Sequence, residues 1–131
     1  MKKLFVISLA ILLLCPVMGN AAGFKNNKIA VASNGKTAQA SVSNQAAKCP
    51  YYLIFDNKEK LTEVIDNPYR DASGGAGPSA ANFLAQRGVT MVIAENFGSK
   101  MINTLKSKGI AHLEFKGSAG DAVKKALEGR Q

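Results

Sequence analysis

Strand-like and helical segments alternate through the second half of the chain, and this alternation restricts the fold more than any other feature. The apolar run over residues 89–94 is typical of a strand covered on both faces. Strands that alternate with helices are joined by crossovers and run parallel. The second half therefore predicts an α/β sheet. The predicted elements are, in order, a helix opened by Gly77-Pro78 and ended by Gly88, the strand over 89–94, a helix over 99–108, a strand over 110–115 and a helix from Ser118.

Three shorter apolar runs in the first half predict further strands, over residues 28–33, 51–55 and 61–65. Only residues 56–60 separate the last two runs, so they should form an antiparallel hairpin whose second strand lies at a sheet edge. Residues 36–49 carry small and polar side chains and are expected to form a loop. Together the elements predict a three-layer α/β domain, with helices on both faces of a mixed five-stranded sheet that contains one antiparallel strand.

The first 22 residues have the layout of a secretory signal peptide. Lys2 and Lys3 are followed by an apolar stretch over residues 4–18 and then by small residues up to Ala22. This stretch is short for a membrane span, which needs about 20 residues; an uncleaved anchor is the alternative. We therefore expect export, to the periplasm or out of the cell, with no stable membrane span after cleavage. The mature chain would then consist of a flexible lead over residues 23–27 and a folded domain over residues 28–129.

Few residues are available for catalysis or for metal ligation. Without the leader the chain keeps one cysteine, Cys49, which can be an inert buried thiol, a metal ligand or an intermolecular bridge in a homodimer. The single histidine, His112, lies in a predicted strand, and nothing places it beside Cys49 as a catalytic dyad requires. A zinc site needs three or four clustered ligands, and the first predicted strand lacks the carboxylate of a two-metal nuclease. We therefore expect no enzymatic activity.

The charge of the chain favours anionic partners. The formal net charge is +8, which falls by two, to +6, without the leader lysines. Such a surplus suits nucleic acid, a membrane surface or a small polyanion, although it can also serve solubility alone. Because the chain has no Trp and no block of five consecutive basic residues, a nucleic-acid platform is not expected.

Two glycine-containing segments, residues 75–77 and 96–98, lead into predicted helices and would each offer backbone N–H groups to an anion. Ligands of open α/β sheets gather at the carboxyl ends of strands, where these segments and the loop over residues 36–49 would converge. Three lysines would then surround a pocket for a compact polyanion; the alternative is that the segments are ordinary connectors. The predicted pocket residues are Lys36, Lys48 and Lys100, with Cys49 as a soft metal ligand.

Five short motifs occur in the order and spacing of one known family: Lys28-Ile29-Ala30-Val31-Ala32-Ser33-Asn34-Gly35, Pro50-Tyr51-Tyr52-Leu53-Ile54-Phe55-Asp56, Asn67-Pro68, Gly74-Gly75-Ala76-Gly77-Pro78 and Asn96-Phe97-Gly98. Through these motifs the chain resembles the dinitrogenase iron–molybdenum cofactor biosynthesis family, which includes nitrogenase accessory proteins and the molybdenum–copper orange protein. The resemblance covers about residues 28–129.

The resemblance implies a ribonuclease H-like fold without nuclease activity, and the binding or carriage of anionic iron–sulfur or molybdenum–sulfur clusters or their precursors. Members commonly carry Ser-Glu-His-Phe-Gly-Arg before the second strand, where this chain has Ser43-Asn44-Gln45-Ala46-Ala47-Lys48. The histidine of that motif is absent here. Lys48 keeps the positive charge of the arginine but not its planar fork, and Cys49 stands where members have Ala or Cys.

These observations predict an exported, non-catalytic carrier of an anionic iron–sulfur or molybdenum-containing cluster or its precursor, which would be passed to an acceptor protein. The alternative is a protein–protein interaction module that docks an acidic partner without bound metal. The predicted contacts are backbone N–H groups at Gly75, Ala76, Gly77, Asn96, Phe97 and Gly98, charge neutralisation by Lys48 and Lys100, and metal ligation by Cys49.

Overall fold

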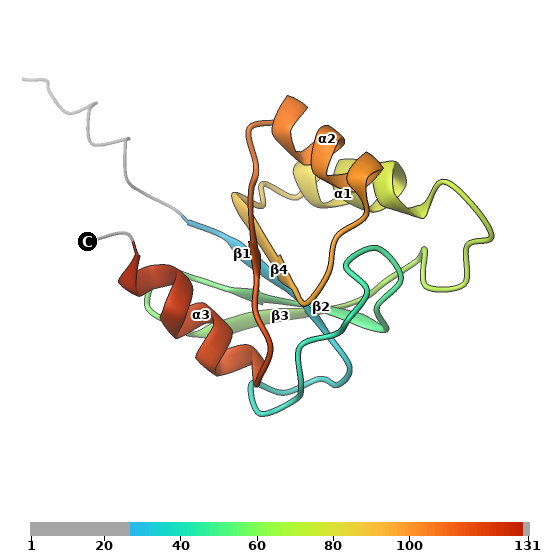
Figure 1. Cartoon of the computed structure of the whole chain (residues 1–131). Coiled ribbons are helices and arrows are strands. Elements are labelled where there is room, and N and C mark those ends of the chain that lie inside the picture. Colours follow the sequence, from blue (N-terminus) through green and yellow to red (C-terminus); the bar gives the residue numbers. More distant parts are fainter. Residues whose placement is uncertain (1–26, 130–131) are drawn as a thin grey trace, which may run out of the picture.

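The computed structural model describes residues 27–129 (Figure 1). The predicted leader lies outside the described residues. Within residues 27–129 no helix is long and apolar enough to cross a membrane. The elements are β1 (Ile29–Ser33), β2 (Tyr51–Phe55), β3 (Leu61–Asp66), α1 (Ala76–Gln86), β4 (Met91–Ala94), α2 (Ser99–Ser107), β5 (Ala111–Glu114) and α3 (Ala119–Glu128).

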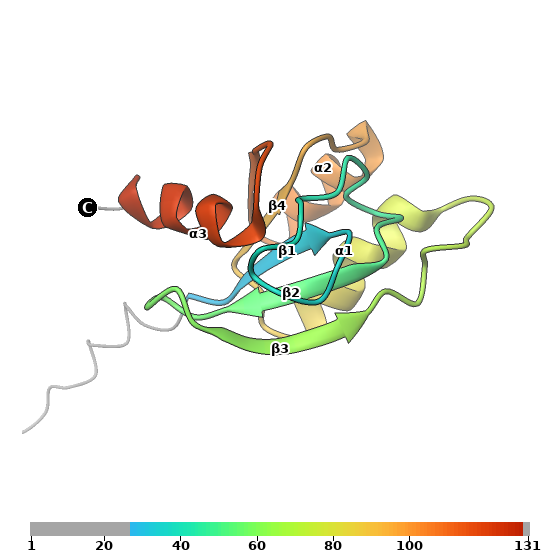
Figure 2. The ribbon, with the colours of Figure 1, turned by 90° about the horizontal axis from the view of Figure 1, so that it is seen from below.

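The five strands form one mixed sheet in the order β3-β2-β1-β4-β5. β2 pairs antiparallel with both β1 and β3, whereas β4 pairs parallel with β1 and with β5. Figure 2 shows the arrows of β1 and β3 pointing one way and that of β2 the other. The predicted mixed sheet is confirmed, with β2 as its antiparallel strand and β3 at one edge.

Side chains that alternate along β1 build a core on each face of the sheet. Ala30 and Ala32 face the cluster formed with α1 and α2, whereas Ile29 and Val31 face the cluster formed with α3. Figure 1 shows α1 and α2 together on one side of the sheet and α3 on the other. The predicted three layers are therefore confirmed, and two of the helices share one face.

Helix α1 begins earlier than the sequence analysis predicts. Gly75, with φ of 72°, is the N-cap residue and Ala76 is the first helical residue. Pro78 is consequently third in the helix, where its missing N–H is still one of the four that an α-helix leaves without an intrahelical partner. At the other end the Val89 N–H donates to the Leu84 carbonyl at 3.2 Å. This bond closes α1, so β4 begins only at residue 91.

Backbone hydrogen bonds tie the long loop between β1 and β2 to the loop after β4. The Glu95 N–H donates to the Ser43 carbonyl at 2.9 Å, and the Ala46 N–H donates to the Asn96 carbonyl at 3.2 Å. Residues 43–48 are therefore held beside the segment that leads into α2.

A candidate anion-binding site between two helix N-termini

The site lies where the chain leaves two adjacent parallel strands in opposite directions. After β1 the chain passes to β2 on one side, and after β4 it passes through α2 to β5 on the other. A crevice outside the carboxyl ends of such strands is the usual ligand site of open α/β sheets. β3 runs in the same direction as β1, so the loop that leads from β3 into α1 reaches the same edge.

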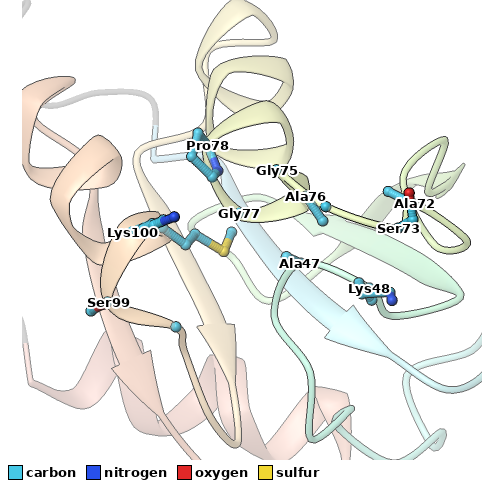
Figure 3. Close-up of a pocket in the computed structure, with 13 residues that line it drawn as sticks. Ala47, Lys48, Ala72, Ser73, Gly75, Ala76, Gly77, Pro78, Ser99 and Lys100 are labelled. Carbon is cyan, nitrogen blue, oxygen red and sulfur yellow. The ribbon is translucent and has the colours of Figure 1, made fainter.

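Segments from these three connections line an open cavity of about 440 Å³ (Figure 3). This volume lies within the range of small-molecule sites. The wall combines the loop before β2, the end of the loop before α1 and the first turns of α1 and α2. The cavity brings together six of the predicted contact residues: Lys48, Gly75, Ala76, Gly77, Gly98 and Lys100.

Helices α1 and α2 both present open N-termini to this cavity. Their N-cap residues, Gly75 and Gly98, provide no side-chain cap, and neither helix has an acidic residue in its first turn. Ser79 and Ile102 donate the first backbone bonds of the two helices, to the carbonyls of the cap residues. The N–H groups before them have no intrahelical acceptor. These N–H groups and the positive ends of two helix dipoles suit an anion.

The two helices approach each other closely at Gly77. A Cβ atom at this position would lie 3.2 Å from both the Cβ and the backbone nitrogen of Met101 in α2. Because real Cβ contacts are rarely so short, a side chain here would push the first turns apart. Glycine at position 77 therefore allows both N-termini to reach one cavity.

Two lysines from different elements flank the cavity. Figure 3 shows Lys48 and Lys100 on opposite sides of it. Both are exposed, and the one ion pair within residues 27–129 joins Arg87 to Glu63, so neither lysine is neutralised by a carboxylate there. Lys100 lies in the first turn of α2, where a cation is unfavourable for the helix.

Two predicted residues lie away from the cavity. The Lys36 ammonium lies 5.4 Å from the centroid of the Tyr51 ring. Cys49 is fully buried, with its thiol 3.9 Å from the Ala46 carbonyl oxygen. Burial raises the pKa of this thiol to about 12, so it stays protonated near neutral pH. Since metals bind the thiolate, this placement does not support the predicted ligand role of Cys49.

The segment Asn96-Phe97-Gly98 forms the wall of a second hollow, of about 370 Å³, which adjoins the first. The two hollows share Ala47, Lys48 and Gly98, but of the two only the second is lined by Asn96 and Phe97. The Phe97 ring packs edge-on against His112, with ring centroids 5.0 Å apart. The single histidine is thus a packing partner of this wall.

Several small residues that line the cavity carry no signal in the sequence. Ala47 and Ser99 belong to the wall, as do Ala72 and Ser73. Their side chains have no distinctive chemistry, so only their nearness to Lys48, Gly75 and Lys100 along the chain points to them.

The donors around the cavity fit an anion and do not fit a bare metal cation. Within residues 27–129 no group of three or more His, Cys, Asp or Glu side chains lies close enough to hold a metal ion. The wall instead offers ammonium groups and backbone N–H groups. A metal-containing ligand would therefore bring its own metal ligands and be held as an anion.

Comparison with known proteins gives the family. A family model described as dinitrogenase iron-molybdenum cofactor matches residues 27–129. The chain belongs to this family. The predicted resemblance is confirmed, and the family is one associated with iron–molybdenum cofactor biosynthesis or binding.

Individual relatives agree with this assignment. An uncharacterised protein of Methanocaldococcus jannaschii is 30% identical over 93 residues, which cover 68% of this chain and 79% of the relative. The apo form of the orange protein from Desulfovibrio gigas is 25% identical with a TM-score of 0.74, covering 79% of this chain and 89% of that one. A NifB-like protein from Thermotoga is 33% identical with a TM-score of 0.67, over 79% of this chain and 90% of that one.

Proposed function

We propose that this chain is a non-enzymatic carrier that binds an anionic metal–sulfur species, of the iron–sulfur or molybdenum–sulfur class, between α1 and α2. The observation that carries this proposal is the convergence of two open helix N-termini and two lysines on one cavity. Membership of the family and similarity to the orange protein support the metal–sulfur class. The leader-like composition of residues 1–22 supports a place of action outside the cytoplasm.

The chemistry of the cavity wall limits which kinds of metal-containing anion can bind. With Cys49 buried and protonated, the cavity supplies no thiolate to complete a metal's coordination. The cargo is then an anion whose metal positions are already filled, for example by sulfide, as in a thiometallate. Backbone N–H groups and ammonium groups hold such an anion through charge-assisted hydrogen bonds. Its transfer to an acceptor protein breaks no protein–metal bond.

An anaerobic titration with tetrathiomolybdate, followed by visible absorption, tests the proposal. We expect saturable binding that weakens as salt is added. Lys48→Ala and Lys100→Ala should each weaken binding about fivefold, since an exposed charge contact contributes about 1 kcal/mol. Lys106→Ala in the last turn of α2 and Lys124→Ala in α3 are matched controls, because neither residue lines the cavity.

Competition with sulfate separates a metal–sulfur site from a general anion site. Tetrathiomolybdate should bind more tightly than sulfate, because it is larger and fills more of the cavity. Absence of tetrathiomolybdate binding, or equal losses in the control variants, would show that the proposed function is wrong. Metal and acid-labile sulfide analysis of protein purified anaerobically provides an independent check.

The thiol offers a separate prediction. Cys49→Ser should bind tetrathiomolybdate as tightly as the parent chain, because the thiol does not reach the cavity. In the folded protein the thiol should also resist alkylation near neutral pH and react only after unfolding, since burial raises its pKa to about 12. Loss of binding in Cys49→Ser with an unchanged melting temperature would restore the thiol as a ligand.

A further inference from the structure

One buried polar side chain near the site is not used by the proposed function. Asn67, the first residue after β3, is only 1% exposed, although its amide is strongly polar. Such a group is stable in the core only when its hydrogen-bonding capacity is filled. Its partners therefore show what the side chain is for.

The Asn67 amide bonds to the chain on both sides of Lys48. Its Nδ2 donates to the Ala47 carbonyl at 2.8 Å and to the Cys49 carbonyl at 2.9 Å. Its Oδ1 accepts from the Tyr69 N–H at 2.9 Å. The flipped amide would place its oxygen against two carbonyl oxygens, so these partners fix the orientation. A single side chain thus holds the peptide groups that bracket Lys48.

Other bonds complete the fixation of this loop. The Tyr52 hydroxyl donates to the Ala46 carbonyl at 2.5 Å, and the Ala46 N–H donates to the Asn96 carbonyl. The Lys48 side chain is exposed, so its position depends on where the backbone is held. Within residues 27–129, Asn67 is the residue whose side chain forms hydrogen bonds to both neighbours of this lysine.

We propose that Asn67 is a positioning residue that holds the Lys48 ammonium at the cavity for the bound anion. The inference rests on the proposed function, because it concerns how Lys48 meets the cargo. An amide is required here, since one nitrogen must donate twice while the oxygen accepts. Asn67→Asp keeps the shape and the acceptor for the Tyr69 N–H, but turns oxygens toward the two carbonyls.

A double-mutant cycle separates positioning from a general role in stability. Asn67→Asp is combined with Lys48→Ala and, separately, with Lys100→Ala, and tetrathiomolybdate affinity is measured at a temperature where each variant is folded by circular dichroism. We expect Asn67→Asp alone to weaken binding about fivefold. It should have almost no further effect in the Lys48→Ala background, yet should keep its full effect in the Lys100→Ala background. Asn67→Ser, which retains a short polar group, is the milder variant if Asn67→Asp does not fold.

The outcomes distinguish the two proposals. Binding by the parent chain with equal, additive losses in both backgrounds would overturn the role of Asn67 and leave the proposed function intact. Unchanged affinity in folded Asn67→Asp and Asn67→Ser would do the same. Absence of binding by the parent chain would overturn the proposed function and the inference together.

Discussion

The N-terminus of α3 differs sharply from those of α1 and α2. In α3 the Ser118 hydroxyl oxygen accepts from the Asp121 N–H at 3.2 Å, and Asp121 places an acid in the first turn. The N–H groups of Ala119 and Gly120 donate to carbonyls of the loop over residues 38–40. This helix end is therefore closed by the protein itself.

The ends of α1 and α2 lack every one of these features. Their caps are Gly75 and Gly98, their first turns contain no acid, and α2 places Lys100 where an acid would stabilise it. Natural sequences depart from such local rules mainly at functional sites. Under the proposed function, the ends of α1 and α2 stay open for the bound anion, which would supply the negative charge that Asp121 supplies to α3.

The largest expected effect comes from giving α2 the acid that it lacks. Lys100→Glu should weaken tetrathiomolybdate binding by at least about tenfold, because one attraction is lost and one repulsion is added. The same change should raise the free energy of unfolding by about 0.5 kcal/mol, since an acid interacts favourably with the helix N-terminus. Binding is measured by titration and stability by thermal unfolding.

Lys106→Glu is the matched control, because Lys106 lies in the last turn of the same helix. There an acid meets the negative end of the dipole, so this variant should lose stability and keep its affinity. A loss of stability in Lys100→Glu would contradict the view that the open end is destabilised for function.

The next effect concerns how closely the two open ends approach. In Gly77→Ala the new methyl group would lie 3.2 Å from Met101, so the first turns of α1 and α2 must separate. We expect about fivefold weaker binding and a stability loss of about 1 kcal/mol. Gly120→Ala in α3 is the matched control: Gly120 is also second in its helix, and its Cβ would lie 3.4 Å from the Ala38 carbonyl oxygen. It should leave affinity unchanged; an equal loss of affinity would remove the special role of Gly77.

A smaller effect is expected at the closed end. Ser118→Ala removes the hydroxyl that accepts from the Asp121 N–H and should lower the free energy of unfolding by about 1 kcal/mol. Because α3 lies on the other face of the sheet, tetrathiomolybdate affinity should not change. Chemical denaturation and the same titration check both points, and a change in affinity would show that the two regions are coupled.

Much of the fold could be predicted because its signals are local. The apolar runs predict the strands, the short link over residues 56–60 predicts the hairpin, and the alternation of strands with helices predicts the parallel part of the mixed sheet. The start of α1 was displaced because Gly75 can adopt a left-handed backbone and act as the cap, which the position of Pro78 does not reveal.

The site was predicted only in part, since it depends on contacts between distant segments. Charge and glycine patterns singled out Lys48, Gly77 and Lys100, which do line one cavity. Residue type alone left the role of Cys49 open between an inert thiol, a metal ligand and an intermolecular bridge, and its burial favours the inert thiol. In the sequence Asn67 stands out only as part of a family motif, since its role depends on carbonyls about twenty residues earlier in the chain.

The smallest expected effect comes from giving α2 the N-cap residue type of α3, which makes the two helix ends alike at that position. Gly98 has φ of −75° and ψ of 152°, close to the −82° and 155° of Ser118, and no atom lies within 4 Å of a Cβ built there. Gly98→Ser should therefore fit without strain and raise the free energy of unfolding by about 0.3 kcal/mol. Its hydroxyl would occupy one N–H group of the open end, so tetrathiomolybdate should bind about twofold to threefold more weakly, a change of about 0.5 kcal/mol. A gain in stability with undiminished affinity would show that the anion does not use the N–H groups of α2, and would leave the lysines as its main contacts.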